Sequence, residues 1–159
     1  MQNILIVCSD KELRKDLSKS LASELKFLYV DVDEVLDFEM LNNSQVNLTQ
    51  ANEVMKMLER KSINRVLGFK DCIVTMSRDL FVSNNNFALM KDYFKVFISL
   101  SKSYFIAKNS KDMYKLEQEL LMMDKINQLV GLNCHITIEK NIQSVQQLSY
   151  EIINQLKKA

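Results

Sequence analysis

Short apolar segments alternate along the chain with longer stretches whose apolar residues recur every three or four positions. The first kind is typical of strands buried on both faces, and the second of amphipathic helices. Strand character is found in residues 3–8, 27–31, 72–76, 95–100 and 134–138. Helical patterns occupy residues 10–25, 33–41, 48–66, 84–93, 110–129 and 144–157. The alternation predicts a three-layer α/β/α fold, in which helices cover both faces of a five-stranded parallel sheet.

Length and charge narrow the classes of function. A chain of 159 residues is expected to form a single domain, 1–159. Its 21 basic and 20 acidic residues nearly cancel, so neither nucleic acid nor a membrane is expected as a partner. The apolar opening at residues 3–8 is too short for a transmembrane helix and lacks the basic start of a signal peptide. We therefore expect a cytoplasmic protein.

The cysteines and the single histidine do not form a recognisable chemical motif. Cys8, Cys72 and Cys134 are far apart and lie at the edges of predicted strands, which is typical of reduced, mostly buried thiols. His135 is the only histidine. We expect no metal site and no histidine-centred dyad, although one histidine can still act as a base.

The turn after the first strand is the usual phosphate cradle of an alternating α/β domain, and such a cradle needs glycines. The chain contains only Gly68 and Gly131, and no proline, so residues 8–16 hold no glycine. The run Ser9-Asp10-Lys11-Glu12 instead fits a capping box, in which Ser9 caps the helix and Glu12 reaches back. The sequence predicts a self-capped turn that holds no nucleotide.

Two aspartates follow the second predicted strand. Period-two alternation places Asp31 and Asp33 on one face at its carboxyl end, where parallel sheets bind ligands. They are therefore candidates for a retained binding pocket. The alternative is that Asp33 caps a helix that begins near Glu34.

Several strings occur in the order and at the distances of one known family. They are residues 3–7 and 21–25, residues 27–36 with an Asp-x-Asp ending, Cys72–Thr75 followed by Val82 and Asn86, and residues 96–100. Together they resemble the shikimate kinase family of small P-loop kinases over nearly the whole chain. The resemblance implies transfer of the γ-phosphoryl group of ATP to a hydroxyl of a small carbocyclic acid, with magnesium between the phosphates.

The resemblance also implies roles for individual residues. The family pattern Gly-x-x-Gly-x-Gly-Lys-Ser/Thr falls on residues 8–15 and keeps none of its glycines. Arg14 stands at the lysine position and Lys15 at the magnesium-binding hydroxyl, so these two are the candidate cofactor-binding residues. Asp31 and Asp33 correspond to residues that hold magnesium through water and the substrate hydroxyl, and Asp33 is the candidate catalytic base.

Other family features are missing or displaced. The substrate-contacting glycine run lands on residues 76–78, which leaves Arg78 as a candidate substrate-binding residue. A second substrate-binding arginine aligns near Met55, with Arg60 close by. The family's lid arginine has no counterpart, because no arginine follows Arg78. Charge in the lid is left to three lysines, at positions 108, 111 and 115.

We therefore expect a shikimate-kinase-like domain whose catalytic apparatus is degenerate, with no cofactor. It would act by binding a small acid ligand or a protein partner. The apolar stripe between Leu116 and Leu129 suits either a contact surface or the core. The alternative is a divergent Mg-ATP-dependent kinase that uses Arg14 and Lys15. A flavodoxin-like regulatory domain is a third hypothesis, and it predicts a different strand order, because a kinase relative places strand three beside strand one.

Overall fold

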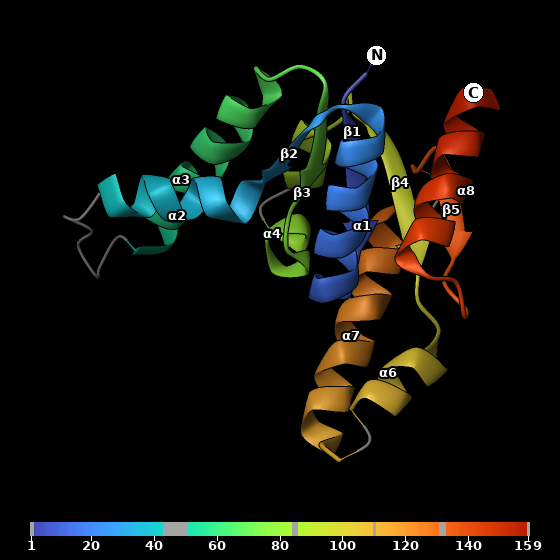
Figure 1. Ribbon diagram of the computed structural model, residues 1–159. Helices are drawn as coiled ribbons and strands as arrows, with labels where there is room; N and C mark the ends of the chain where they lie inside the picture. The colour runs from blue at the N-terminus through green and yellow to red at the C-terminus, as the bar shows by residue number, and fades with distance from the viewer. Residues whose placement is uncertain (1, 43–50, 84–85, 110, 131–132, 159) are drawn as a thin grey trace.

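The computed structural model describes residues 2–42, 51–83, 86–109, 111–130 and 133–158. Its strands form one sheet of five, all parallel, in the order β2-β3-β1-β4-β5 (Figure 1). The strands are β1 (Ile4–Cys8), β2 (Leu28–Asp31), β3 (Cys72–Thr75), β4 (Phe94–Ser99) and β5 (Ile136–Glu139). The predicted fold class is confirmed. Strand three lies beside strand one, which excludes the flavodoxin-like order.

The helices flank this sheet. They are α1 (Lys11–Leu25), α2 (Val32–Asn42), α3 (Ala51–Leu67), α4 (Arg78–Val82), α5 (Asn86–Leu89), α6 (Lys102–Lys108), α7 (Met113–Val130) and α8 (Val145–Lys158). The long helices agree with the sequence prediction to within a few residues, although 48–50 lie outside the described residues. The helix predicted over 84–93 is wrong, because the described part of it holds only the single turn α5. Two short helices, α4 and α6, were not predicted.

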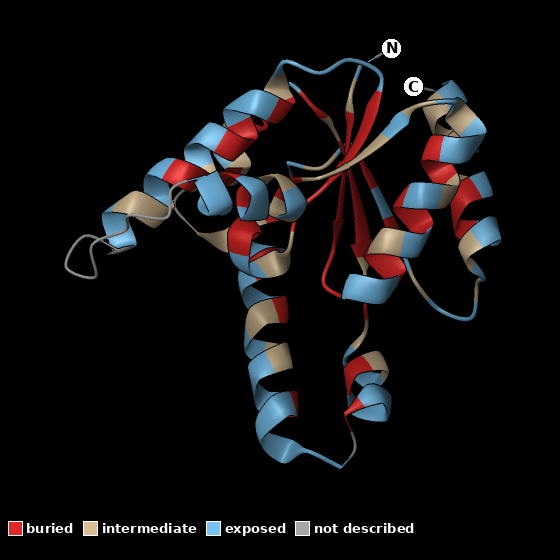
Figure 2. Cartoon of the chain, turned by 60° about the vertical axis from the view of Figure 1, so that its left-hand side comes forward, coloured by how far each residue is buried: buried red, intermediate tan, exposed pale blue. Residues whose placement is uncertain are grey.

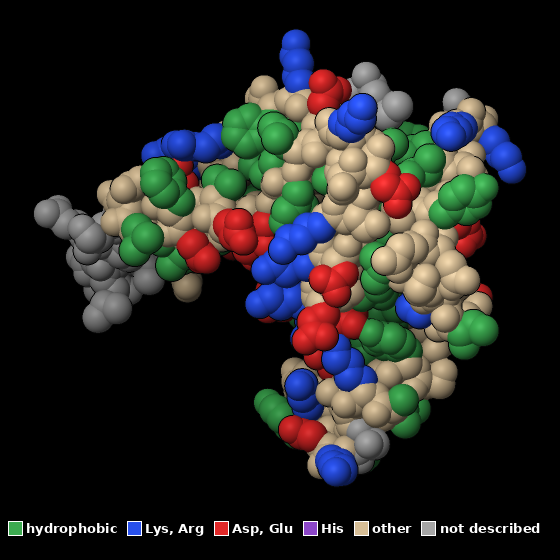
Figure 3. Space-filling model, viewed as in Figure 1, with side chains coloured by type: hydrophobic (Ala, Val, Ile, Leu, Met, Phe, Trp, Pro, Cys, Tyr) green, Lys and Arg blue, Asp and Glu red, His purple; other side chains and the backbone are tan. Residues whose placement is uncertain are grey.

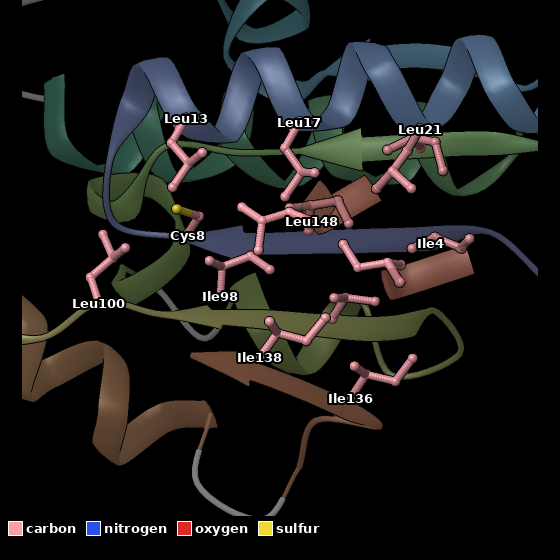
Figure 4. Packing of buried hydrophobic residues seen from close by; sticks show 14 of the residues in the cluster. Ile4, Cys8, Leu13, Leu17, Leu21, Ile98, Leu100, Ile136, Ile138 and Leu148 are labelled. Carbon is pink, nitrogen blue, oxygen red and sulfur yellow. The ribbon is translucent and has the colours of Figure 1, made fainter. Parts of the chain in front are cut away.

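Strand β1 contributes to two hydrophobic cores, one on each face of the sheet. Ile4, Ile6 and Cys8 belong to the core beneath α1 and α8, whereas Leu5 and Val7 belong to the core beneath α2 and α3. Figure 2 shows the buried strands between helices whose outer faces are exposed. In Figure 4, the leucines of α1 at positions 13, 17 and 21 point onto the strands. This packing fixes the start of α1 at the end of β1.

Helices α2 and α3 form a pair that extends from one side of the sheet (Figure 1). The buried carboxylate of Glu39 joins them, because it lies 3.1 Å from Lys61 Nζ and 2.5 Å from Arg65 Nη2. Burying an isolated carboxylate would be costly, and the two cations offset that cost. The pairing holds α2, which continues directly from β2, at a fixed angle to the sheet.

Helix α1 ends without a glycine. Lys26 follows its last residue in the left-handed conformation, with φ of 59°, and donates its backbone N–H to the carbonyls of Ala22 and Ser23. Glycine is the usual residue at this position, because a side chain there costs free energy. Lys26 therefore satisfies the helix end at the expense of local strain.

The cysteines and the histidine lie among core and strand residues. Cys8 and Cys72 are buried, and burial raises the pKa of the Cys8 thiol to about 12. The His135 ring stacks on Phe94, and its Nδ1 accepts the N–H of Lys95 at 3.0 Å. Within the described ranges, no helix is both long and apolar enough to span a membrane.

Candidate functional site

A cavity of about 580 Å³ lies at the carboxyl ends of β1, β2 and β3. Ligands of parallel α/β sheets bind at this edge. The cavity is lined by all of the candidate site residues that the sequence indicated, which are Arg14, Lys15, Asp31, Asp33 and Arg78. Three of them come from the starts of α1 and α4, and the aspartates come from the junction of β2 and α2. The fold thus brings together residues that are up to 64 positions apart.

The turn from β1 to α1 is short. Only Ser9 and Asp10 separate Cys8 from Lys11, and the Arg14 N–H already donates to the Asp10 carbonyl at 2.9 Å. The predicted capping box is wrong: Asp10, rather than Ser9, occupies the N-cap position, and its side chain makes no capping hydrogen bond. The physical reason is that stronger donors on α6 bind the Asp10 carboxylate.

Asp10 is 7% exposed and joins the turn to α6. Its Oδ1 accepts a hydrogen bond from Lys108 Nζ at 2.6 Å, and its Oδ2 accepts one from the Tyr104 hydroxyl. Burial alone would raise the pKa of Asp10, but the hydrogen bonds from Lys108 and Tyr104 outweigh it and lower the pKa below its ordinary value. Burial and the bond to Asp10 raise the pKa of Tyr104. The sequence places the Asp10 carboxylate in this turn, but sequence reasoning missed Tyr104 and the pairing of Asp10 with Lys108.

Arg14 is the most deeply buried cation of the cavity, with 6% of its surface exposed. Its Nη1 donates to the carbonyl of Cys8 at 2.9 Å, and this is the one hydrogen bond of its guanidinium within the described residues. Lys15 is half-buried and Lys11 is exposed. Because they are four residues apart on α1, the two lysines lie on the same side of the helix. Both line the cavity.

Asp31 and Asp33 act at the junction of β2 and α2. Asp31 Oδ1 accepts the N–H of Asp33 at 3.0 Å, so Asp31 caps a helix that begins at Val32. The alternative in which Asp33 caps this helix is wrong, because Asp33 Oδ2 accepts the Ser77 N–H at 2.6 Å across the cavity edge. Burial and the nearby carboxylates of Asp33 and Glu34 raise the pKa of Asp31.

Arg78 begins α4 and binds Glu119 of α7 with both ends of its guanidinium. Nη2 donates to Glu119 Oε1 at 2.7 Å, and Nη1 donates to Oε2. The Ser77 hydroxyl accepts the Leu80 N–H at 3.2 Å and caps α4. Two-point pairing of this kind fixes both partners. Arg78 therefore lines the cavity as predicted, but its guanidinium is already bound by Glu119, a residue that the sequence did not indicate.

Several other residues that the resemblance pointed to do not line the cavity. Arg60 lines a separate surface hollow on α3, and Met55 packs at the edge of a core, so neither supplies the second substrate-binding arginine. Of the lid lysines, Lys108 and Lys115 line the cavity and Lys111 does not. The apolar stripe on α7 contributes to the core through its buried members, while other members are exposed. Buried are Leu116, Met123 and Ile126, and exposed is Leu121.

Comparison with solved structures identifies the fold. Shikimate kinase from Acinetobacter baumannii, solved in complex with shikimate, has a TM-score of 0.76 and 17% identity over 99% of this chain and 94% of that one. Shikimate kinase from Aquifex aeolicus has a TM-score of 0.69 and 15% identity over 98% and 96%. The fold is that of the shikimate kinases.

Related kinases share this shikimate-kinase-like fold less closely. Dephospho-CoA kinase from Campylobacter jejuni has a TM-score of 0.66 and 10% identity over 98% of this chain and 97% of that one. No protein-family model and no curated protein matches the sequence. The structural similarity establishes the fold. Because the sequence identities are this low, the chemistry has to be argued from the residues of the cavity.

Proposed function

We propose that this protein is a catalytically degenerate relative of the shikimate kinases, which acts by binding a small ligand or a protein partner and does not transfer phosphoryl groups from ATP. The observation that carries the proposal is the buried carboxylate of Asp10, held in the turn where P-loop kinases cradle phosphate.

The short turn argues against a bound triphosphate. A P-loop wraps its phosphates with backbone N–H groups from a glycine-rich loop. Here two residues join β1 to α1, and the residues aligned with the rest of the loop are already helical. The Asp10 carboxylate lies in this turn and already accepts hydrogen bonds from Lys108 and Tyr104, so a phosphate there would have to compete with it for these donors. The residues present do not fit Mg-ATP.

The charges of the cavity support the same conclusion. Seven acidic and six basic side chains line it, so it offers no net positive field for a polyanion. Glu119 and Asp10 already neutralise Arg78 and Lys108. Lys15 stands where the resemblance implies a magnesium-binding hydroxyl, and a protonated lysine does not coordinate a cation.

One observation favours a second function, a divergent ATP-dependent kinase. Arg14, Lys15, Asp33 and Arg78 all line a single cavity, as the resemblance implies for phosphate, base and substrate positions. In that reading Asp33 is the base and a small acid such as shikimate is the acceptor. Arg14 would contact the phosphates in place of the usual lysine.

Calorimetry separates the two functions. The protein is titrated with Mg-ATP to about 5 mM, and ADP release is followed with shikimate as acceptor. We expect neither heat of binding nor turnover. Saturable binding with ADP release that is abolished in Arg14→Ala, and retained in Lys19→Ala as an exposed control on the same helix outside the cavity, would establish the divergent kinase and overturn the degenerate reading.

A further inference from the structure

The ion pairs of the cavity leave most of its other charges in two groups, a basic wall and an acidic wall. Lys108 is paired with Asp10, and Arg78 is paired with Glu119, so these four side chains contribute little net field. Seven of the nine other charged side chains that line the cavity lie on α1 and at the junction of β2 with α2, and the remaining two are Asp79 of α4 and Lys115 of α7. In Figure 3, Lys and Arg side chains lie beside Asp and Glu side chains in the region between α2 and α1.

The basic wall comes from the first turns of α1. It consists of Lys11, Arg14 and Lys15. Arg14 is buried, and it has no carboxylate partner within the described part of the chain, only a neutral carbonyl. A buried guanidinium without a counter-charge is costly, and an anion in the cavity would remove that cost. This wall therefore fits the anionic end of a ligand.

The acidic wall comes from the junction of β2 with α2. It consists of Asp31, Asp33, Glu34 and Asp37. Glu34 and Asp37 are three residues apart and exposed, so they lie on one side of α2. Burial is the largest cause of the raised pKa of Asp31, and the neighbouring carboxylates of Asp33 and Glu34 raise this pKa further by repulsion. A cationic group would relieve that repulsion.

We propose that the cavity binds a small zwitterion, with a primary ammonium group at the acidic wall and a carboxylate or phosphate at the basic wall. This inference rests on the proposed function, because it requires a cavity free of ATP. A polyanion is repelled by one wall and a simple cation by the other, whereas a molecule with both charges is attracted by each. The cavity volume of about 580 Å³ accommodates a small metabolite.

Binding is tested by calorimetry and chemical-shift titration with defined probes. These are 3-aminopropanoate, 4-aminobutanoate, 6-aminohexanoate and phosphoethanolamine, each to about 10 mM. The N-acetyl derivative and the amide of each amino acid retain a single charge and serve as matched controls. We expect saturable binding of at least one zwitterion, roughly tenfold or more tighter than either single-charge derivative. Preference for phosphoethanolamine over the amino acids would identify phosphate as the anionic group.

Two double variants test the walls separately. Glu34→Gln with Asp37→Asn, and Lys11→Gln with Lys15→Gln, should each weaken binding roughly tenfold or more. The exposed control substitutions Asp16→Asn and Lys102→Gln, outside the cavity, should leave binding unchanged. Urea unfolding confirms that the variants are folded.

Three results would overturn the inference: no probe binds, the single-charge derivatives bind equally well, or a wall variant binds as the parent does. The Mg-ATP titration on the same protein tests the proposed function independently of the zwitterion titrations. Turnover of ATP there would refute the proposed function, whereas failure of the zwitterions alone would leave the proposed function standing.

Discussion

Asp10 joins the turn after β1 to α6, and replacing it should measurably destabilise the protein. In Asp10→Asn the buried charge is lost while the size and shape of the side chain remain. The amide oxygen of asparagine can still accept from Lys108, and its nitrogen can donate to the Tyr104 hydroxyl. Both contacts then lack the negative charge that strengthens them, and we expect each to be weaker.

The magnitude follows from the exposure of the partners. A hydrogen bond to a charged group contributes roughly 1.5–3 kcal/mol when it is buried. Lys108 is 45% exposed, so solvent screening reduces the contribution of its ion pair with Asp10 to about 1 kcal/mol or less. Tyr104 is half-buried and donates the better protected bond. We expect Asp10→Asn to lower the free energy of unfolding by about 2 kcal/mol, and Tm by about 4–8 °C for a chain of this length.

The assay is urea unfolding at neutral pH of the parent, Asp10→Asn, Tyr104→Phe and the double variant. The double-mutant cycle should give a coupling energy of about 1 kcal/mol or more. The exposed substitution Asp16→Asn on the same helix should change stability by less than about 0.5 kcal/mol. A coupling energy near zero, or a parent no more stable than Asp10→Asn, would refute the reasoning.

The pH dependence provides a second check on Asp10. Because its pKa is lower in the folded state than its ordinary value of 3.8, its contribution is fully present above that value. It is lost as the pH falls through the folded-state pKa. The stability difference between the parent and Asp10→Asn should therefore be constant near neutral pH and shrink below about pH 4. A difference that persists unchanged in acid would assign the stabilisation to packing instead of charge.

Three further predictions concern stability. Asp31 has a raised pKa in the folded state, so Asp31→Asn should be more stable than the parent at neutral pH, and urea titrations should show the gap narrowing as the pH falls toward 3.8 and closed below that value. Lys26→Gly should gain about 1 kcal/mol because glycine adopts φ of 59° without strain, and an unchanged Tm would contradict this. Leu17→Ala should lose about 3 kcal/mol in urea unfolding, since the side chain is fully buried; a loss under about 1 kcal/mol would mean that the core refills the space.

The architecture was largely predictable from the sequence. Strands buried on both faces and long amphipathic helices have strong periodic patterns, so the sheet and helices such as α1 and α8 were located to within a few residues. The short helices α4 and α6 have too few residues for periodicity to show. Their N-caps, Ser77 and Ser101, were the available signal, because each hydroxyl accepts an N–H three residues later.

The sequence indicated several residues that line the cavity, but not the contacts that their side chains make. Strand polarity alone places Asp31 and Asp33 at the ligand-binding edge, and the resemblance adds Arg14, Lys15 and Arg78. The partners Glu119 and Tyr104 lie 41 and 94 positions away from the residues they bind, and no local pattern reports such distances. The capping box failed for the same reason, because a short-range rule competed with a long-range ion pair at Asp10.

The central position of β1 has a consequence for how the molecule comes apart. Its neighbours β3 and β4 hydrogen-bond to it on either side, and alternate residues anchor opposite cores. Neither half of the protein is therefore able to melt while the other keeps its middle strand intact. Hydrogen exchange should be slowest at the amides of Leu5 and Ile6, with protection that matches the free energy of global unfolding.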